Sequence, residues 1–241
     1  MEKEFQKPLK YIFILLFMKI SNVEIKWLGH DGFFLKNLDT GKNIYIDPYN
    51  IKDNLEKADL ILITHGHYDH CSIADIEKII KEGTKIIATA DCQSKIAKID
   101  VPIKLEIVEP NMELDLGRIK IFTVPAYNVD KHFHPKEGHW VGYLIKINDV
   151  VIYHSGDCDI MPEMQKLTGY KHSGKEFVAL LPVSGRFVMN SEEAAEAAKI
   201  FKPTLAIPMH YGSIVGTQED AQEFVELCKE EGINAKILEK E

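Results

Sequence analysis

Short, wholly apolar runs alternate with amphipathic segments over most of the chain, which predicts a protein of mixed strands and helices. Residues 60–64 and 177–182 contain hardly any polar side chain, as is typical of strands buried on both faces. Alternating apolar and polar positions mark the other strands. The predicted strands are 23–27, 32–36, 43–47, 60–64, 85–89, 119–125, 141–147, 150–154, 177–182, 205–209 and 233–238.

Helical patterns fill several of the gaps between these strands. Ser72 with Asp75, and Asn190 with Glu193, have the spacing of a capping box at a helix start. The predicted helices are 72–82, 91–98, 190–201 and 217–231.

Two segments of the chain resemble each other. Trp27 is followed by a predicted hairpin and by Asp47 at a strand end, and Trp140 is followed by a second hairpin and by Asp157. The repeated order indicates two similar β-rich halves covered by helices, which is an α/β (α+β) fold with a four-layer αββα sandwich. A chance similarity between two hairpins is the alternative.

We expect residues 18–241 to form one domain because no low-complexity linker interrupts them. Before them, residues 11–18 form an apolar run between Lys10 and Lys19. The run is far shorter than the roughly 20 residues needed to cross a bilayer, and no signal-peptide cleavage site follows. Residues 1–17 are interpreted as an extension from an upstream start site, with an added strand or helix, or a membrane anchor, as alternatives.

Composition narrows the functional classes. Of the 241 residues, 45% are hydrophobic and 27% are charged, and the formal net charge is −8, which argues against a disordered chain and against a polybasic nucleic-acid binder. The four cysteines form no Cys-x-x-Cys pair. We therefore expect free thiols and a cytoplasmic protein.

The strongest chemical signal follows the apolar run at 60–64. The sequence His65-Gly-His67-Tyr-Asp69-His70 places three imidazoles and one carboxylate within six residues. Alternate residues of an extended turn point the same way, so His65 and His67 can bind one metal ion. Asp69 and His70 then face a second position nearby. Imidazoles with a carboxylate suit zinc, and also iron or manganese.

Further ligands are expected at other strand ends, because one short motif cannot complete two metal sites. Asp157 and His210 each follow a predicted strand. A third source is the stretch after the strand at 119–125, which contains Asn128, His132 and His134.

These motifs, with the opening Trp27-Leu-Gly-His30, the strand end Asp47-Pro48 and the stretch Ala206-Ile-Pro-Met-His210-Tyr211, resemble the metallo-β-lactamase superfamily of metal-dependent hydrolases. The resemblance covers roughly residues 20–240 and is strongest to the small-hydrolase branch that includes the ascorbate-6-phosphate lactonase. It implies an αββα fold with the site at the strand ends between the sheets. Carried over, His65 and His67 bind metal one, Asp69, His70 and His210 bind metal two, and Asp157 bridges them.

The chain departs from the superfamily pattern at one ligand. The superfamily usually supplies a further histidine to metal one just after the strand that here ends at 125, where this chain has Tyr127 and Asn128. His134 could reach back from the following loop and is the preferred candidate. Asn128 or a water, and His132, are the alternatives.

The resemblance implies a metal-dependent hydrolase with two divalent ions, zinc in the first instance and manganese or iron otherwise. Such ions lower the pKa of a shared water and stabilise a developing oxyanion. The expected reaction is cleavage of an ester, lactone or phosphoester of a small molecule by a metal-bridging hydroxide. Asp69 would orient this nucleophile and Asp157 would hold both ions.

Two other functions on the same fold are possible. Diiron redox relatives resemble this motif but have Glu where His67 stands, so His67 favours hydrolysis. A non-catalytic metal-binding module is the second alternative. RNA processing is disfavoured because the nuclease branches resemble this core plus an inserted domain, and a charge of −8 does not attract phosphate backbones.

Several other polar residues have both a functional and a structural interpretation. His30 could edge the site or cap a turn, and Asp47 could support the metal loop or only a turn. Arg186 could anchor an anionic group, although solvation is the simpler interpretation. His154 is expected in the core and His172 in a solvated loop.

Loops at 126–140 and 159–176 are expected to set the substrate. Lys131 and Lys136 in the first loop could cover an anionic ligand, with a solvated loop as the alternative. No nucleic-acid partner and no membrane span are expected. The oligomeric state cannot be inferred from the sequence.

Overall fold

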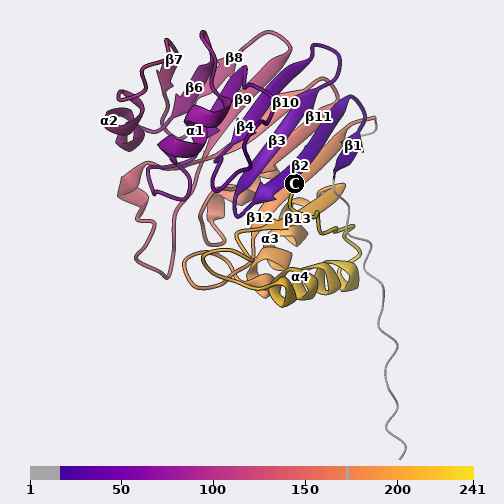
Figure 1. The fold of residues 1–241 in the computed structure, drawn as a ribbon. Coiled ribbons are helices and arrows are strands. Elements are labelled where there is room, and N and C mark those ends of the chain that lie inside the picture. The colour runs from indigo at the N-terminus through magenta and orange to yellow at the C-terminus, as the bar shows by residue number, and fades with distance from the viewer. Residues whose placement is uncertain (1–16, 172–173) are drawn as a thin grey trace, which may run out of the picture.

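The computed structural model describes residues 17–171 and 174–241, which form two β-sheets with helices outside them (Figure 1). The first sheet has seven strands in the spatial order β1-β2-β3-β4-β5-β6-β7. These are β1 (Met18–Ile20), β2 (Val23–Gly29), β3 (Gly32–Asn37), β4 (Lys42–Ile46), β5 (Leu60–Ile63), β6 (Lys85–Ala88) and β7 (Lys104–Ile107). Strands β1 to β4 pair antiparallel, and β4 to β7 pair parallel.

The second sheet has six strands in the order β13-β12-β11-β10-β9-β8. These are β8 (Glu113–Asp115), β9 (Ile119–Pro125), β10 (Val141–Ile147), β11 (Val150–His154), β12 (Glu176–Pro182) and β13 (Leu205–Met209). Strands β8 to β11 are antiparallel and β11 to β13 are parallel. Each sheet thus contains one of the two similar hairpins, followed by parallel strands.

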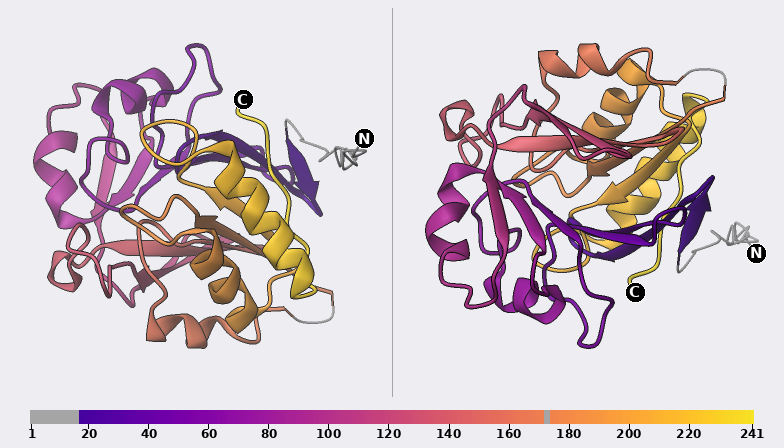
Figure 2. Two further views of the ribbon diagram at one scale, coloured as in Figure 1. Left: turned by 90° about the horizontal axis from the view of Figure 1, so that it is seen from below. Right: turned by 90° about the horizontal axis from the view of Figure 1, so that it is seen from above.

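The two sheets pack face to face, and the helices cover their outer faces (Figure 2). On the first sheet, α1 (Ile73–Ile79), η1 (Ala90–Cys92) and α2 (Gln93–Ile96) close a core of isoleucines from β5 and β6. On the second, η3 (Pro162–Leu167), α3 (Ser191–Phe201) and α4 (Gln218–Glu230) complete the main core. The short η2 (Lys136–Gly138) lies in the loop before β10. The predicted four-layer αββα sandwich is confirmed.

One tyrosine ties the sheets together in the buried interior. Tyr143 of β10 is fully buried and its hydroxyl donates a hydrogen bond to the carbonyl oxygen of Ile63 in β5, at 2.7 Å. A buried hydroxyl without a partner would be costly, so this contact fixes the separation of the sheets at that point. The contact lies two residues before His65, which begins the predicted metal motif.

The predictions from local sequence are wrong where tertiary contacts determine the conformation of a segment. The predicted strand at 233–238 is absent; the segment makes only single bridges, such as Ala206 with Ala235. The helix predicted at 72–82 ends at Ile79, and Ser72 does not cap it, since its hydroxyl donates instead to Asp75. The capping box at Asn190 and Glu193 is confirmed. Residues 1–16 and His172 lie outside the described residues, so the predictions made for them stay untested.

Membrane insertion finds no support among the described helices. None of those in residues 17–171 and 174–241 combines the length and the apolar character that crossing a bilayer requires.

Asp75 anchors the loop after β4 to α1, and we expect its replacement to destabilise the fold. Its carboxylate accepts hydrogen bonds from the backbone of Asn50 and Ile51 and from the Ser72 hydroxyl, and it pairs with Lys78. Asp75→Asn should lower the free energy of unfolding by about 1–3 kcal/mol at pH 7. Urea denaturation measures this, with the exposed neighbour Asp53→Asn as the near-neutral control.

The same substitution should lose its effect in acid. Burial raises the pKa of Asp75, but the hydrogen bonds from Ser72 and Asn50 outweigh burial and lower it below 3.8. A carboxylate whose pKa is lowered by folding stabilises the protein at pH values above its unfolded pKa. This stabilisation is lost as the pH falls through the lower pKa of the folded state. An Asp75→Asn effect that stays constant from pH 7 to pH 2 would contradict this account.

Candidate metal centre

The residues predicted as ligands lie at the carboxyl ends of strands from both sheets. His65, His67, Asp69 and His70 follow β5, Asp157 follows β11 and His210 follows β13. Parallel strands bring their carboxyl ends to one edge, and the facing sheets bring the two edges together. The structure therefore gathers residues that are up to 145 positions apart in the chain.

The first group of donor atoms comes from three imidazoles. Single donor atoms of His65, His67 and His134 lie within 4.8 Å of one another, and His65 Nε2 is 2.9 Å from His67 Nδ1. His134 is buried although it belongs to a loop. Of the three residues considered for this position, the structure places His134 beside the other two histidines.

Asn128 holds His134 in this position. The Asn128 side-chain oxygen accepts a hydrogen bond from the backbone N–H of His134 at 2.9 Å and lies 3.1 Å from its Nδ1. Nε2 of His134 is thereby turned towards the group. His132, in contrast, is exposed. Asn128 thus orients a histidine that lies six residues further along the chain.

A tryptophan and an aspartate support the metal loop from outside. The Trp140 ring packs against His65, with ring centroids 4.8 Å apart. Asp91 Oδ2 accepts hydrogen bonds from Trp140 Nε1 and from the backbone N–H of Gly66, both at 2.8 Å. A Cβ at position 66 would stand 2.5 Å from this oxygen, so a larger residue would displace the carboxylate that supports the loop.

The second group forms around Asp157. Its Oδ2 lies 3.4 Å from His70 Nε2, 3.3 Å from His210 Nε2 and 3.1 Å from His134 Nε2. Asp157 thus contacts both groups of histidines. Asp69 is at the rim of this group, with Oδ2 4.0 Å from His70 Nε2.

Hydrogen bonds behind the imidazoles fix their direction. Nδ1 of His70 lies 2.8 Å from Asp47 Oδ2, and Asp47 also accepts bonds from the backbone and the hydroxyl of Thr64. Nδ1 of His210 lies 2.7 Å from Ser184 Oγ. An imidazole bonded at Nδ1 presents Nε2 to the site, which is how proteins orient metal-binding histidines. Asp47 is placed as the predicted support; Ser184 was not predicted.

The donor set fits cations. Four buried side-chain atoms of the predicted ligands or their neighbours have no hydrogen-bond partner: His70 Nε2, His134 Nε2, Asp157 Oδ1 and Asp31 Oδ2. Burial lowers the pKa of His65 well below 6.5, so its ring is a neutral donor. Burial also lowers that of His70, but the charges of Asp157 and Asp47 outweigh it and raise the pKa well above 6.5. The carboxylates therefore require positive charge between them.

His30 is close to the second group and keeps Asp69 ionised. Its Nε2 lies 3.1 Å from Asp69 Oδ2. Burial raises the pKa of Asp69, but the hydrogen bond from His30 and the charge of His70 prevail and lower it to about 2. Of the two interpretations of His30, the structure favours the one in which it edges the site.

Sequence reasoning missed Asp31. It stands in the turn between β2 and β3, is 0% exposed, and both of its carboxylate oxygens lack hydrogen-bond partners. Its Oδ2 lies 3.5 Å from His30 Nε2, 3.9 Å from His210 Nε2 and 4.0 Å from His70 Nε2. His154, the expected core histidine, is buried and donates from Nε2 to the Asp31 carbonyl oxygen at 2.9 Å.

A cavity of about 250 Å³ opens over the ligand groups. Its polar floor is made by predicted ligands, and its rim by Tyr68, Phe133, Phe187 and Ile214. Lys131 and Lys136 do not line it. Lys131 pairs with Asp159 at 2.6 Å and Lys136 with Glu163 at 3.3 Å, so the structure does not support a cationic cover over an anionic ligand.

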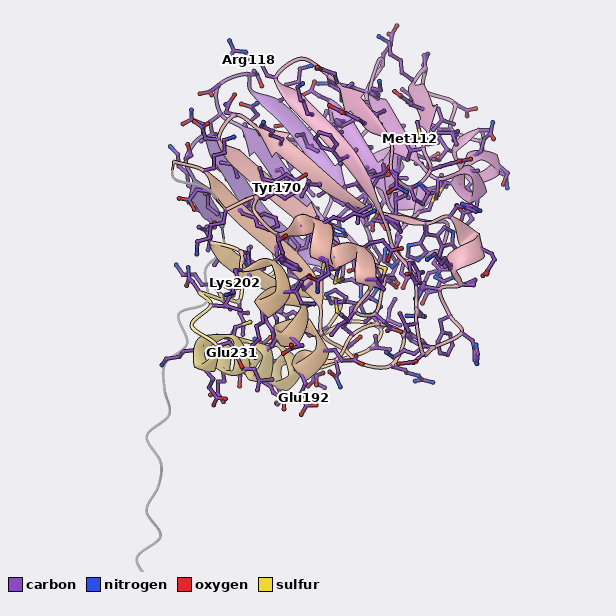
Figure 3. All side chains as sticks on the ribbon, turned by 180° about the vertical axis from the view of Figure 1, so that it is seen from behind. Met112, Arg118, Tyr170, Glu192, Lys202 and Glu231 are labelled. Atoms are coloured by element: carbon purple, nitrogen blue, oxygen red, sulfur yellow. The ribbon has the colours of Figure 1, made fainter. Side chains whose placement is uncertain are left out.

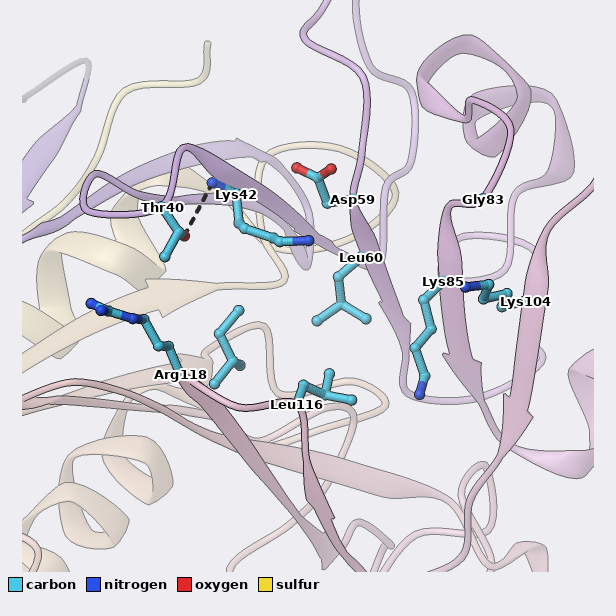
Figure 4. Close-up of a pocket in the computed structure, with 10 residues that line it drawn as sticks. Thr40, Lys42, Asp59, Leu60, Gly83, Lys85, Lys104, Leu116 and Arg118 are labelled. Carbon is cyan, nitrogen blue, oxygen red and sulfur yellow. Dashed lines mark hydrogen bonds between the residues drawn. The ribbon is translucent and has the colours of Figure 1, made fainter.

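A larger cavity of about 470 Å³ lies at the other end of the same strands and is remote from this chemistry (Figure 4). It is lined by Asp59 and Leu60 at the start of β5 and by Arg118 just before β9. Arg118 lies at the opposite end of the molecule from Glu192, in the first turn of α3 (Figure 3). The smaller cavity, with its converging donors, is therefore the candidate active site.

Comparisons with known proteins identify the class of protein. A family model described as "Beta-lactamase superfamily domain" matches residues 24–210. A solved structure described as a metal-dependent hydrolase from Parabacteroides distasonis is 29% identical, has a TM-score of 0.77, and the match covers 89% of this chain and 92% of that one. A metallo hydrolase from Ignicoccus hospitalis, 24% identical with a TM-score of 0.73 and coverage of 90% and 95%, shares the fold.

The curated relatives narrow this class. The UPF0173 metal-dependent hydrolase of Pyrococcus furiosus is 33% identical over 230 residues, which are 90% of this chain and 95% of the relative. The chain belongs to the UPF0173 family of metal-dependent hydrolases, within the metallo-β-lactamase superfamily.

Proposed function

We propose that this hydrolase uses two divalent ions, bound side by side, to cleave a small-molecule ester or lactone. The observation that carries the proposal is the position of Asp157, whose carboxylate contacts histidines of both donor groups. One carboxylate between two sets of converging imidazoles is suited to bridging two ions about 3.5–4 Å apart.

The donor sets suggest an assignment for each ion. His65, His67 and His134 would hold metal one, and His70, His210 and Asp69 would hold metal two. Zinc suits the imidazole-rich first position, and manganese or iron would also be accepted at the second. Bound ions would supply an activated water and polarise the carbonyl oxygen of the substrate.

The residues of the chain bind and orient the substrate. Asp69 is partly accessible from the cavity and is kept ionised by His30, so it can accept a hydrogen bond from an attacking water and orient it. The ester or lactone group would lie on the polar floor. Its apolar part would contact the rim, where Tyr68 is 62% and Phe133 is 52% exposed.

This rim favours substrates with an acyl or aryl group. Because uncharged residues make the rim, we prefer carboxylic esters and lactones, the chemistry suggested by the resemblance to the ascorbate-6-phosphate lactonase, over phosphoesters. The four cysteines are free and buried, which supports a reducing cytoplasm as the location.

A hydrolase screen with metal quantification tests the proposal. The purified chain should hold two equivalents of divalent metal and hydrolyse aryl esters or lactones faster than phosphodiesters. Chelation should abolish turnover, and added zinc or manganese should restore it. A chain that binds two ions yet hydrolyses no ester, lactone or phosphoester would refute the proposed function. Iron content with visible absorption would redirect the search to redox chemistry.

The rim itself can be tested with one substitution. Phe133 packs edge-on against Phe187, with centroids 4.6 Å apart, and forms one wall of the cavity. Phe133→Ala should raise KM for a long-chain or aryl ester about 10-fold, a loss of about 1.4 kcal/mol, and change KM for the acetate much less. Phe17→Ala, at an equally exposed phenylalanine that does not line the cavity, is the control. Equal changes for both esters would contradict this role.

A further inference from the structure

We infer that Asp31 is an additional oxygen ligand of the second metal ion, outside the ligand set carried over from the superfamily. The inference rests on the two-ion site proposed above and assigns one further residue to it. Asp31 is contributed by the turn between β2 and β3, which supplies no ligand in the predicted set. The second position would then have three carboxylates near it, from Asp31, Asp69 and Asp157.

The first argument is the state of the Asp31 side chain. It is 0% exposed, and neither oxygen has a hydrogen-bond partner. Buried carboxylates are normally paired, hydrogen-bonded or bound to a metal, because an isolated buried charge is very costly. The other buried acids near the site illustrate the contrast. Asp47 accepts three hydrogen bonds, and Asp159 accepts bonds from Asn128, Lys131 and the backbone.

The second argument is geometric. Donor atoms bound to one ion at about 2.1 Å stand about 3.0–4.2 Å apart, from adjacent to opposite positions. Asp31 Oδ2 lies 3.9 Å from His210 Nε2 and 4.0 Å from His70 Nε2, so all three atoms can contact a common ion. One donor atom each from His30, Asp31, His70 and His210 also lies within 4.8 Å of the others.

The backbone around Asp31 keeps the carboxylate in place. Its carbonyl oxygen accepts from His154, and the neighbouring His30 carbonyl accepts from Trp27 Nε1 and from the backbone N–H of His210. The turn is thereby tied to the strand ends that carry the other ligands. A rigid turn that aims a carboxylate without hydrogen-bond partners at two imidazoles is preorganised for a cation.

The assignment changes the metal preference that the site should show. Carboxylate oxygens suit manganese better than they suit zinc, whose structural and catalytic sites are dominated by nitrogen and sulfur. With Asp31, the second position becomes the oxygen-rich one and the first remains the imidazole-rich one. The two ions need not be the same element.

Metal titration of the full chain tests the inference. Wild type, Asp31→Ala and Asp31→Asn are loaded with Zn²⁺ or Mn²⁺, dialysed, and measured by mass spectrometry and calorimetry. Both variants should bind the second equivalent at least 100-fold more weakly, since loss of mere supporting residues already costs 10–100-fold, with the larger loss for Mn²⁺. The first equivalent should be unchanged. Asp75→Asn, a buried carboxylate whose partners are complete, should retain both equivalents.

Thermal unfolding after chelation provides a second measurement, in which the melting temperatures of the Asp31 and Asp75 variants should change in opposite directions. Removing a buried carboxylate that has no hydrogen-bond partner should raise the melting temperature of the metal-free chain, whereas Asp75→Asn should lower it. Wild-type affinity for both equivalents in both Asp31 variants would overturn the inference without affecting the proposed function. A wild-type chain that binds two ions but has no hydrolase activity would overturn the function and leave this inference standing.

Discussion

Asp157→Ala should reduce kcat by about 10⁴-fold or more for any substrate found in the screen, the scale of losing a central member of a catalytic group. Asp157 is 4% exposed and lies within 3.4 Å of three histidine nitrogens. Its loss would remove the one carboxylate that contacts both donor groups. The fold should persist, because each ion pair that this carboxylate makes within the described residues joins it to a histidine of the candidate site.

Steady-state kinetics with matched metal analysis checks this result. Asp115→Ala, at an exposed carboxylate on β8, serves as the control and should retain wild-type rates. The circular dichroism spectra of the wild type and of the two variants should be the same. An Asp157→Ala protein with more than a tenth of wild-type activity and fewer than two bound ions would show that the bridge is not needed for turnover.

Removal of the metal is expected to have the second largest effect, this time on stability. Ligands that bind only the folded state stabilise it by about 4 kcal/mol at 1,000 times their dissociation constant. For a domain of this size, 1 kcal/mol corresponds to about 2–4 °C, so chelation should lower the melting temperature by about 8–16 °C. Asp31 gives the physical reason, since its buried carboxylate would be left without a hydrogen-bond partner once the ion is removed.

Scanning fluorimetry before and after chelation measures this shift, and added metal should reverse it. A double variant, His70→Ala with His210→Ala, lacks both imidazoles of the second position and should show a smaller shift on chelation. An unchanged melting temperature, in a sample shown to have lost its metal, would mean that the metal-free site is not strained.

The contiguous part of the site could be predicted from sequence because its spacing alone brings donors together. His65, His67 and His70 need only the end of one buried strand. Asp157 and His210 could be predicted because parallel strands place their carboxyl ends at one edge of a sheet. His134 was harder, since its position depends on Asn128 and on the carbonyl oxygen of Phe187, 53 residues further along the chain.

Asp31 could not be recognised in the same way. An aspartate after Gly29 and His30 looks like an ordinary hairpin-turn residue, and turns favour aspartate for local reasons. Its significance lies in what it lacks, which are the hydrogen bonds that a turn aspartate normally makes. The one available signal was a charged residue beside His30 in the stretch from Trp27 to Leu35, whose other residues are apolar or glycine.

The fold shows the same division between local and tertiary causes. The strands β9, β10, β11 and β13 have the predicted bounds, because their apolar positions follow a clear pattern and are buried. The edge strands β7 and β8 were missed, since they are only four and three residues long. Their conformation depends on a neighbouring strand and has almost no periodic pattern of its own.

The candidate ligands are divided between the two sheets: the histidines after β5 belong to one layer, and His134, Asp157 and His210 to the other. An ion held by both sets would join the layers as a cross-link does, at the edge opposite the Arg118 end. Opening of the sandwich at that edge, and with it the exchange of β5 and β11 amide protons with solvent, would then require an ion to leave. Release of the metal ion and local opening of the two sheets would be a single coupled equilibrium.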